Sequence, residues 1–214
     1  MSHTIYKVND KRVKSVTTII NAQLGWNKQV LLGWTRKHCL NGDDSLKILT
    51  NAGKTGTLAH KMIESFIEGK SVVLDKYTPT QISEAKTAYY GYWDWQKGKK
   101  WQICDTEMKM VSEKYKFGGT VDCIYKERGK YYILDFKTSN SCHDEYIVQL
   151  AAYRQLYEEN SGNKIIGGII LKLDKNKREY KEYKITKKDL DWGWKVFTNC
   201  LNLQELKTSG GYKW

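Results

Sequence analysis

Three charged side chains stand inside the segments of this sequence that most resemble β-strands. Asp122 interrupts the run 117–126, and Asp135 and Lys137 lie two residues apart in the run 131–138. Because an unpaired carboxylate is unfavourable to bury, these acids need either partner side chains or a cation. Residues i and i+2 of a strand project to one face, so Asp135 and Lys137 share a face, which Asp122 can reach if the two runs pair as a hairpin.

Two carboxylates and an amine that converge on one point of a sheet suit a site for a hard divalent metal. Carboxylate oxygens favour Mg²⁺ or Mn²⁺, which retain waters and bridge to phosphate oxygens. The lysine can orient or deprotonate an attacking water, or stabilise the charge that develops on a phosphate. The alternative is an Asp–Lys salt bridge on a solvated strand face, which is the commoner meaning of an isolated D-x-K tripeptide.

Three further features favour the metal site over the salt bridge. Gly118 and Gly119 stand in the first strand-like run and allow another backbone, or a nucleic-acid strand, to come close. Gln149 and Tyr153 lie one turn apart on a single face of the helix expected after the D-x-K strand. His60 lies on the flank of an earlier amphipathic helix, where a purely structural role would be the ordinary interpretation of a lone histidine.

In this combination the motifs resemble those of the PD-(D/E)XK nuclease superfamily. The segments GTLAHKMIES, TEMKMVSEKYKFGGTVDCI, ILDFKTS and QLAAYRQLYE occur in the family's order and at similar separations, over roughly residues 14–205. The likeness is closest to the RecB-like exonucleases with an upstream G-x-x-x-H motif. That group includes the mitochondrial genome maintenance exonuclease and the CRISPR-associated Cas-type exonucleases.

The resemblance implies a metal site and a catalytic lysine. His60, Asp122 and Asp135 would be ligands of Mg²⁺ or Mn²⁺, and the carbonyl of Phe136 would add a further oxygen. Lys137 would be the catalytic lysine. Some relatives also hold an iron–sulfur cluster through four cysteines, one early and three clustered late in the chain. The late cluster of cysteines is missing here, so no iron–sulfur cluster is expected.

The resemblance also implies supporting roles around this centre. Gln149 and Tyr153 would orient the lysine or hold the scissile phosphate. Glu107 would assist the metal aspartate or bind a second metal, and Glu64, one turn after His60, would orient the imidazole. A structural role is equally open for both glutamates. Contacts with DNA are implied for the following residues, with helix capping an equal alternative for the first two: Ser15, Thr17, Gly118, Gly119, Thr138, Ser139 and Tyr153.

Charge and aromatic content indicate the class of substrate. The chain has 36 Lys and Arg against 24 Asp and Glu, a net charge of +12, which favours a polyanionic partner. The segment 89–101 interleaves aromatic residues with lysines, as single-strand channels do, unless it is an amphipathic helix that buries its aromatic rings. With the family likeness, these features predict a single-stranded DNA exonuclease that promotes in-line attack of water on a phosphodiester.

Two alternatives to this prediction stay open. One is a structure-specific or restriction-like endonuclease of the same fold. The other is a non-catalytic DNA-binding subunit of a recombination assembly, although such a subunit would not need the full set of His60, Asp122, Asp135 and Lys137. Cleavage polarity, tolerance of RNA, oligomeric state and protein partners cannot be inferred from these motifs.

The elements that must hold these residues follow from hydrophobic periodicity. Residues 1–100 are expected to be mostly helical and to contribute His60 and DNA contacts, while 101–214 form the nuclease core, within one compact unit. The fold class is α/β, with a mixed central sheet of the restriction-endonuclease type in α-β-β-β-α-β order. Ser141 is expected to cap the helix of the core. The expected strands and helices of the core are 101–113, 117–127, 130–139, 141–162, 164–173, 179–186 and 187–210.

The composition indicates where the protein works. The N-terminal segment lacks the apolar stretch of a signal peptide, and no apolar run reaches the ~20 residues of a membrane span. Five scattered cysteines without a C-x-x-C pair indicate reduced thiols. We therefore expect a cytoplasmic protein without a membrane partner. Lysine- and asparagine-rich usage suggests a viral gene, with a role in recombination, repair or viral genome processing.

Overall fold

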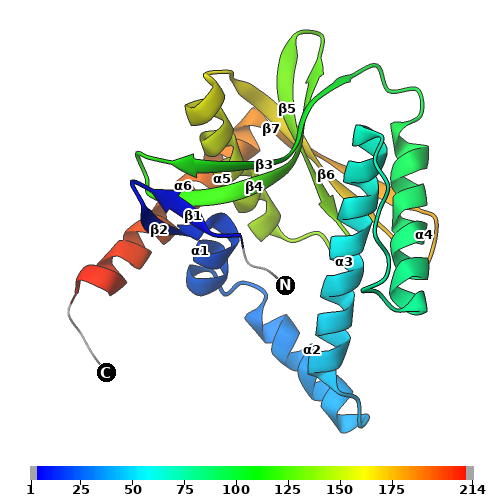
Figure 1. Cartoon of the computed structure of the whole chain (residues 1–214). Helices are drawn as coiled ribbons and strands as arrows, with labels where there is room; N and C mark the ends of the chain where they lie inside the picture. Colours follow the sequence, from blue (N-terminus) through cyan, green and yellow to red (C-terminus); the bar gives the residue numbers. More distant parts are fainter. Residues whose placement is uncertain (1–3, 211–214) are drawn as a thin grey trace.

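A mixed β-sheet of seven strands runs through the middle of the molecule in the computed structural model, which describes residues 4–210 (Figure 1). The strand order is β1-β2-β4-β5-β6-β7, and β3 pairs with β4 outside this path. The pairs β2–β4 and β5–β6 are parallel and the other pairs are antiparallel. The strands are β1 Tyr6–Val8, β2 Lys11–Ser15, β3 Gln102–Ser112, β4 Phe117–Glu127, β5 Lys130–Lys137, β6 Ile165–Leu173 and β7 Tyr180–Thr186.

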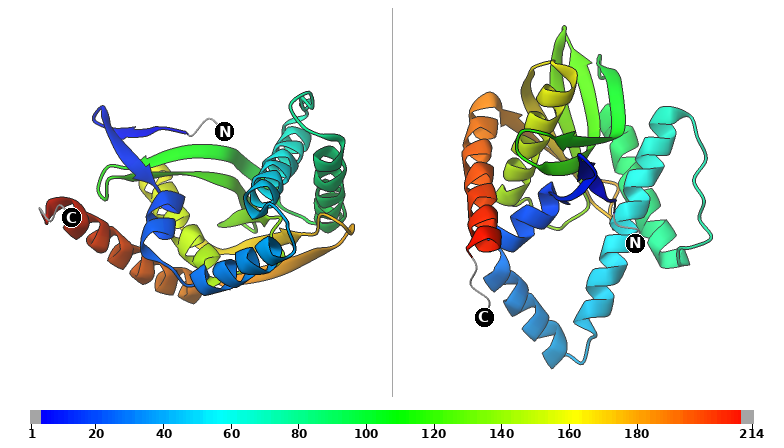
Figure 2. Two further views of the ribbon diagram at one scale, coloured as in Figure 1. Left: turned by 90° about the horizontal axis from the view of Figure 1, so that it is seen from below. Right: turned by 60° about the vertical axis from the view of Figure 1, so that its left-hand side comes forward.

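Helices cover both faces of this sheet (Figures 1 and 2). α1, α5 and α6 pack on one face, and α3 and α4 pack together on the other. The α/β fold with a mixed central sheet is therefore confirmed. The helices are α1 Val16–Gln23, α2 Lys28–Leu40, α3 Ser45–Glu68, α4 Pro79–Gln96, α5 Asp144–Ser161 and α6 Lys187–Ser209.

Alternate residues of the central strands supply two separate cores. In β5, Ile133 packs among α1, α5 and α6, whereas the next residue, Leu134, packs against α3 and α4. This alternation is the two-residue period of a strand that is covered on both faces. Phe197 of α6 anchors the first core and Leu58 of α3 the second, both fully buried. The two layers of helices are thus held by opposite faces of the same strands.

The N-terminal strands β1 and β2 are an addition to the elements expected from the sequence. They form a hairpin, and β2 then pairs with the start of β4, so the N-terminal part of the chain is joined to the sheet of the core. β2 passes directly into α1, where the side chain of Ser15 accepts a hydrogen bond from the Thr18 N–H at 3.1 Å. The capping alternative for Ser15 is therefore the one observed.

The expected cap of α5 is wrong. The helix begins at Asp144, with His143 at the N-cap position and no capping hydrogen bond from a side chain. Ser141 lies two residues before the N-cap position and does not cap the helix. It belongs instead to the bend that follows β5, in which its carbonyl accepts a hydrogen bond from the Ser139 hydroxyl at 2.8 Å. The loop between β5 and α5 is therefore organised around its own turn, directly beyond Lys137.

The aromatic segment 89–101 contributes mainly to the core. Tyr92 and Trp95 are buried against α3 and the sheet, as expected for an amphipathic helix. Trp95 Nε1 donates a hydrogen bond to the Glu182 carboxylate, and Lys99 forms an ion pair with the same carboxylate at 2.7 Å. Packing in the core therefore explains several of the aromatic residues in this segment, whereas Tyr90 is exposed. Within residues 4–210 no helix is both long enough and apolar enough to cross a membrane.

A pair of glycine substitutions tests the packing of α6 on α5. A Cβ at Gly193 would lie 2.8 Å from the Ile147 carbonyl oxygen and 2.9 Å from the Ala151 Cβ, whereas a Cβ at Gly33 in α2 would meet nothing within 4 Å. We expect Gly193→Ala to lower the free energy of unfolding by about 1–3 kcal/mol. Gly33→Ala should raise it by roughly 0.5–1 kcal/mol. Equilibrium urea unfolding measures both, and equal effects would contradict the close helix contact.

Candidate active site

A gap in the β-sheet lies at the middle of β4. β2 pairs with β4 as far as Ser15 and Gly118, and β5 pairs with it only from Leu134 and Cys123 onward. Within the described chain, residues 119–122 of β4 therefore have no strand beside them on this edge. At the gap β2 turns into α1 and β5 leads toward α5, so the sheet opens where the predicted catalytic residues begin.

Three carboxylates lie in a row across the strands at this gap. The antiparallel registers of β3 and β5 on β4 place Glu107 and Asp135 on either side of Asp122. Glu107 has a φ of 46°, which residues other than glycine rarely adopt. The strand alternation also slips at Asp122, because Val121 and Cys123 pack into opposite cores although residues two apart normally share a face. The backbone is thus irregular on both strands where the acids meet.

Asp122 takes the place of a missing strand partner. Its Oδ2 accepts a hydrogen bond from the Phe136 N–H at 2.8 Å, so a side chain bridges β4 and β5 where their backbone ladder has ended. The same oxygen lies 3.5 Å from His60 Nδ1 of α3. The imidazole also meets the Phe136 ring edge to face, with centroids 5.8 Å apart. Asp122 therefore links both strands to the helix on the other side of the gap.

A glycine lets α3 approach the end of β5 closely enough for this contact. A Cβ at Gly56 would lie only 2.9 Å from the Thr138 Oγ1, just beyond the end of β5. His60 follows Gly56 by four residues, which places both on one face of the helix. The G-x-x-x-H spacing thus has a steric meaning: the glycine admits the helix, and the histidine then reaches Asp122.

Asp135 is the most buried charged residue of the site. Its side chain is 1% exposed, and neither carboxylate oxygen has a hydrogen-bond partner in the described chain. Lys137 Nζ forms an ion pair with Oδ2 at 2.5 Å, so the Asp–Lys salt bridge that was the alternative to a metal site is present, although it is buried rather than solvated. The lysine also lies 4.9 Å from the centre of the Tyr146 ring. An ammonium therefore offsets the buried carboxylate through Oδ2, and Oδ1 has no partner in the described chain.

Helix α5 adds the predicted glutamine and tyrosine. Gln149 donates a hydrogen bond from Nε2 to the Tyr153 hydroxyl at 2.8 Å. Tyr153 is buried, and a Cβ at Gly119 would lie 2.7 Å from its ring, so the glycine gives the tyrosine its place over β4. Burial raises the pKa of Tyr153 well above its usual value, and the nearby Asp135 raises it further. The phenol therefore stays protonated and can donate a hydrogen bond toward the site.

The residues predicted to contact DNA lie around the gap, and several of them are in contact with other side chains of the protein. Gly118 is buried beneath Tyr6, where an added Cβ would lie 2.4–2.6 Å from the tyrosine side chain, so packing alone accounts for this glycine. The Ser139 hydroxyl accepts a hydrogen bond from Tyr146. Thr17 is exposed at the start of α1. A role of these residues in binding DNA stays a prediction.

Glu64 lies on the same helix as His60, and the described structure contains no hydrogen bond between the two side chains. The negative charge of Glu64 instead acts on Glu107, whose pKa it helps to raise. The predicted role of Glu64 in orienting the imidazole therefore rests on the spacing of the two residues alone.

Burial makes two of the three carboxylates reluctant to ionise. Burial is the main cause that raises the pKa of Glu107 to about 7, and the negative charge of Asp122 adds to it. Burial likewise raises the pKa of Asp135 to about 6, with Asp122 adding and Lys137 opposing. In both cases, a neighbouring acid disfavours the charge. Near pH 7 Glu107 is therefore partly protonated in the metal-free site, and a bound cation would displace that proton.

The other three groups have pKa values that favour their charged forms. Burial alone would raise the pKa of Asp122, but His60, Lys137 and the Phe136 N–H outweigh it and hold that pKa below its usual value. For His60, the attraction of Asp122 outweighs burial and raises the pKa. For Lys137, Asp135 and Asp122 together outweigh burial and raise the pKa. The free site thus contains a charged lysine rather than a neutral amine.

The donor set fits a hard divalent cation. One ligand atom from each of His60, Glu107 and Asp122 lies within 4.8 Å of the others, a spacing that one ion can span. Asp135 lies outside this group, but it belongs to the next strand, and its Oδ1 has no partner in the described chain. Carboxylate oxygens with one imidazole suit Mg²⁺ or Mn²⁺. Glu107 therefore lies closer to the expected ligands than its predicted assisting role implied.

Two residues near the site were not singled out as functional by the sequence analysis. Gly56 belongs to the G-x-x-x-H spacing, and the four-residue interval to His60 is a signal that could have identified it. Tyr146 packs its ring against Lys137 and anchors Ser139, but nothing in its sequence context distinguishes it from a core tyrosine.

Comparisons with known proteins found a family model and solved structures that are similar to this chain. A family model described as PD-(D/E)XK nuclease superfamily matches residues 32–205. Among solved structures, a candidate exonuclease from Eubacterium rectale is 15% identical, with a TM-score of 0.50 over 74% of this chain and 69% of that one. An alkaline exonuclease from Laribacter hongkongensis is 11% identical, with a TM-score of 0.34 over 72% and 84% of the two chains. No curated protein matches the sequence.

The raised pKa values predict that cation binding releases protons. Glu107, with a pKa of about 7, is largely protonated at pH 6.5 and must ionise to bind, so affinity for Mn²⁺ should rise with pH through 7 and level off above 8. Isothermal titration in buffers of different ionisation enthalpy should show proton release at pH 6.5 and little at pH 8.5. Glu107→Gln should reduce the release, and Glu127→Gln, at the exposed end of β4, should not. Equal release at both pH values would contradict the assignment.

Proposed function

This chain belongs to the PD-(D/E)XK nuclease superfamily, and on that premise we propose that it is a Mg²⁺- or Mn²⁺-dependent exonuclease of the RecB-like branch, acting on single-stranded DNA. The observation that carries the proposal is Asp135, a buried carboxylate at the gap in the sheet that forms an ion pair with Lys137 through one oxygen and has no partner in the described chain for the other. For a purely structural residue this position is unfavourable on balance, because desolvation and Asp122 oppose the charge of the carboxylate and Lys137 offsets them only in part. A carboxylate that receives a cation would be stabilised there.

A divalent cation bound here would supply positive charge that polarises a phosphoryl oxygen and lowers the pKa of a nearby water. It would be held by His60 of α3, Glu107 of β3 and Asp122 of β4, with Asp135 offering its unpaired oxygen Oδ1. The Phe136 carbonyl would be a further donor. The rigid sheet would keep these groups in place, so little reorganisation would be needed when the substrate binds.

The charge state of Lys137 selects between its two predicted roles. The raised pKa keeps the ammonium protonated at neutral pH, so the lysine would stabilise negative charge on the phosphate or orient water through its N–H groups. It would not remove a proton from water in the free site. Gln149 and Tyr153, already joined by a hydrogen bond, would present the tyrosine hydroxyl to the same phosphate.

Single-stranded DNA is proposed as substrate for reasons of charge and family likeness. The net charge of +12 favours a phosphate backbone. The branch that the motifs resemble supports the exonucleolytic mode. A cytoplasmic location and a role in recombination, repair or viral genome processing are part of the same proposal. A structure-specific or restriction-like endonuclease is the second candidate.

Degradation of end-labelled DNA tests the catalytic proposal. We expect linear single strands to be degraded when Mg²⁺ or Mn²⁺ is present and to persist in EDTA. Lys137→Ala should slow the reaction by about 100-fold or more, because the site loses its charge-stabilising group. Lys86→Ala, on the exposed side of α4, removes the same charge far from the gap and should leave the rate unchanged. Tight binding of DNA without cleavage under either metal would overturn the proposal in favour of a binding subunit.

Circular substrates separate the two modes of cleavage. An exonuclease needs a free end, so a covalently closed single-stranded circle should survive conditions that degrade its linearised form. Loss of the circle at a comparable rate would instead establish an endonuclease. Duplex DNA in a parallel reaction tests the preference for single strands, which predicts slower loss of the duplex.

A further inference from the structure

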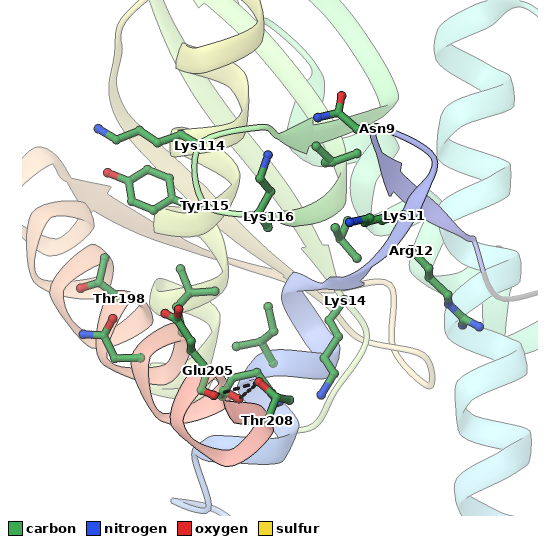
Figure 3. A pocket seen from close by; sticks show the side chains of 16 residues that line it. Asn9, Lys11, Arg12, Lys14, Lys114, Tyr115, Lys116, Thr198, Glu205 and Thr208 are labelled. Carbon is green, nitrogen blue, oxygen red and sulfur yellow. Dashed lines mark hydrogen bonds between the residues drawn. The ribbon is translucent and has the colours of Figure 1, made fainter. Parts of the chain in front are cut away.

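A second concave surface lies away from the candidate active site. A cavity of about 780 Å³ is formed between the β1–β2 turn, the β3–β4 turn and α6 (Figure 3). Its apolar floor includes Val8, Ile19 and Leu201, so the walls are of low dielectric constant. Figure 3 shows Lys114, Lys116 and Asn9 along the side formed by the two turns, with Glu205 and Thr208 of α6 across from them. We call this cavity the basic pocket.

The lining of the basic pocket is strongly cationic. Five basic side chains line it, and none of them forms an ion pair with any residue of the described chain. Glu205 is the one carboxylate among the lining residues. Asp10 and Glu113 belong to the same two turns but do not line the cavity. A concave cluster of unneutralised charge above an apolar floor concentrates field lines and attracts anions. The cationic side chains are Lys11, Arg12, Lys14, Lys114 and Lys116.

Glu159 of α5 holds the β3–β4 turn, which carries two of these lysines, in a fixed conformation. Its carboxylate accepts hydrogen bonds from the N–H groups of Glu113 and Lys114, at 2.9 and 3.2 Å, and from the Ser112 hydroxyl at 2.7 Å. Lys116 has a φ of 55° at the end of the turn. A ligand that binds these lysines therefore meets a backbone that is already ordered, which lowers the entropy lost on binding.

The β1–β2 turn is likewise tight. Asn9 and Asp10 have φ values of 49° and 60°, a pair of positive values typical of two-residue hairpin turns. Lys11 and Arg12 follow on β2, and Lys14 pairs with Phe117 at the start of β4. The basic side chains of both turns are therefore tied to one register of the sheet.

We propose that the basic pocket binds the sugar–phosphate backbone of DNA outside the catalytic gap, so that the strand is held at two points of the sheet. Phe117 and Asp122 are five residues apart on β4, about 17 Å of extended strand. At an axial rise of 3.4 Å per nucleotide in a stacked strand, this distance corresponds to about five nucleotides. Ser15 lies between the two points, at the end of β2. The inference rests on the proposed function for its substrate, but the binding it describes does not require cleavage.

The shape of the pocket favours a nucleic acid over a membrane. A bilayer surface is broad, and a protein meets it with exposed apolar or basic side chains on a convex or flat face. Here the basic residues lie around a hollow between three elements, although Figure 3 shows the side chain of Arg12 directed away from it, and such a hollow admits a strand but not a lipid surface. Phosphates spaced along a flexible chain can occupy several of these cations at once.

The dependence of binding on DNA length tests this inference. Fluorescence anisotropy in EDTA, which prevents cleavage, would compare labelled thymidine oligonucleotides of about 4, 8, 12 and 16 residues. The unaltered protein should bind more tightly as the strand becomes long enough to reach both points. Lys114→Gln with Lys116→Gln should bind the 4-mer as before and the 12- and 16-mers about tenfold more weakly. The slope of log Kd against log salt concentration should fall by about 1.4 for two lost phosphate contacts.

Lys76→Gln with Lys86→Gln is the matched control, since it removes two exposed lysines from the α4 side of the molecule. Equal losses in the control and the pocket variant would show that net charge alone is measured, and would overturn the inference. Unchanged affinity of the pocket variant for the 16-mer would also overturn it. The inference would also be overturned if the pocket variant bound phosphatidylserine vesicles more weakly than the unaltered protein but bound DNA equally well. A protein that binds as expected but never cleaves would refute the exonuclease proposal alone.

Discussion

The burial of Asp135 beside a single ammonium is the interaction on which the rest of the site depends. Lys137 forms an ion pair with one carboxylate oxygen, the other oxygen has no partner among residues 4–210, and burial raises the pKa of the carboxyl to about 6. The gap in the β4 ladder creates this position, because β5 separates from β4 beyond Cys123 and leaves polar backbone and side chains without strand partners. The Asp122 carboxylate bridges the gap by accepting a hydrogen bond from the Phe136 N–H. Glu107, on the neighbouring strand, has a positive φ. The sheet thus carries strain and unsatisfied charge at one point, as functional sites commonly do.

Helices on both faces turn this local irregularity into a defined site. Gly56 lets α3 lie close to Thr138, and His60 then reaches Asp122 from the side of the second core. On the opposite face, Tyr153 of α5 occupies the space above a glycine of β4. In both places a glycine leaves the space that a side chain would fill. The close approach of the two helices therefore depends on these glycines as well as on the charged residues. The predicted catalytic groups therefore lie on strands and helices rather than in loops.

The central strands and α5 could be predicted from the sequence because their signals are strong. The apolar run of β6 and the D-x-K tripeptide of β5 are local patterns, and Gln149 with Tyr153 follows the helical period. The β1–β2 hairpin could not, because its strands are only three and five residues long and are rich in lysine and arginine, as a polar loop would be. The nearness of Glu107 to Asp122 was also hidden, because it depends on the register between two strands rather than on either strand alone. The basic pocket is assembled from three separate segments and has no local signature.

The most direct test of the account is the location of a bound cation. A crystal of the metal-free protein soaked in Mn²⁺ would be measured by anomalous diffraction near the manganese edge. The account predicts an anomalous peak at the gap in the sheet, within about 2.0–2.3 Å of carboxylate oxygens from Glu107 and Asp122 and next to Asp135. It also predicts that the peak is lost in Asp122→Asn. Absence of a peak there at millimolar Mn²⁺, with the carboxylates unmoved, would contradict the claim that the buried acids exist to hold a metal.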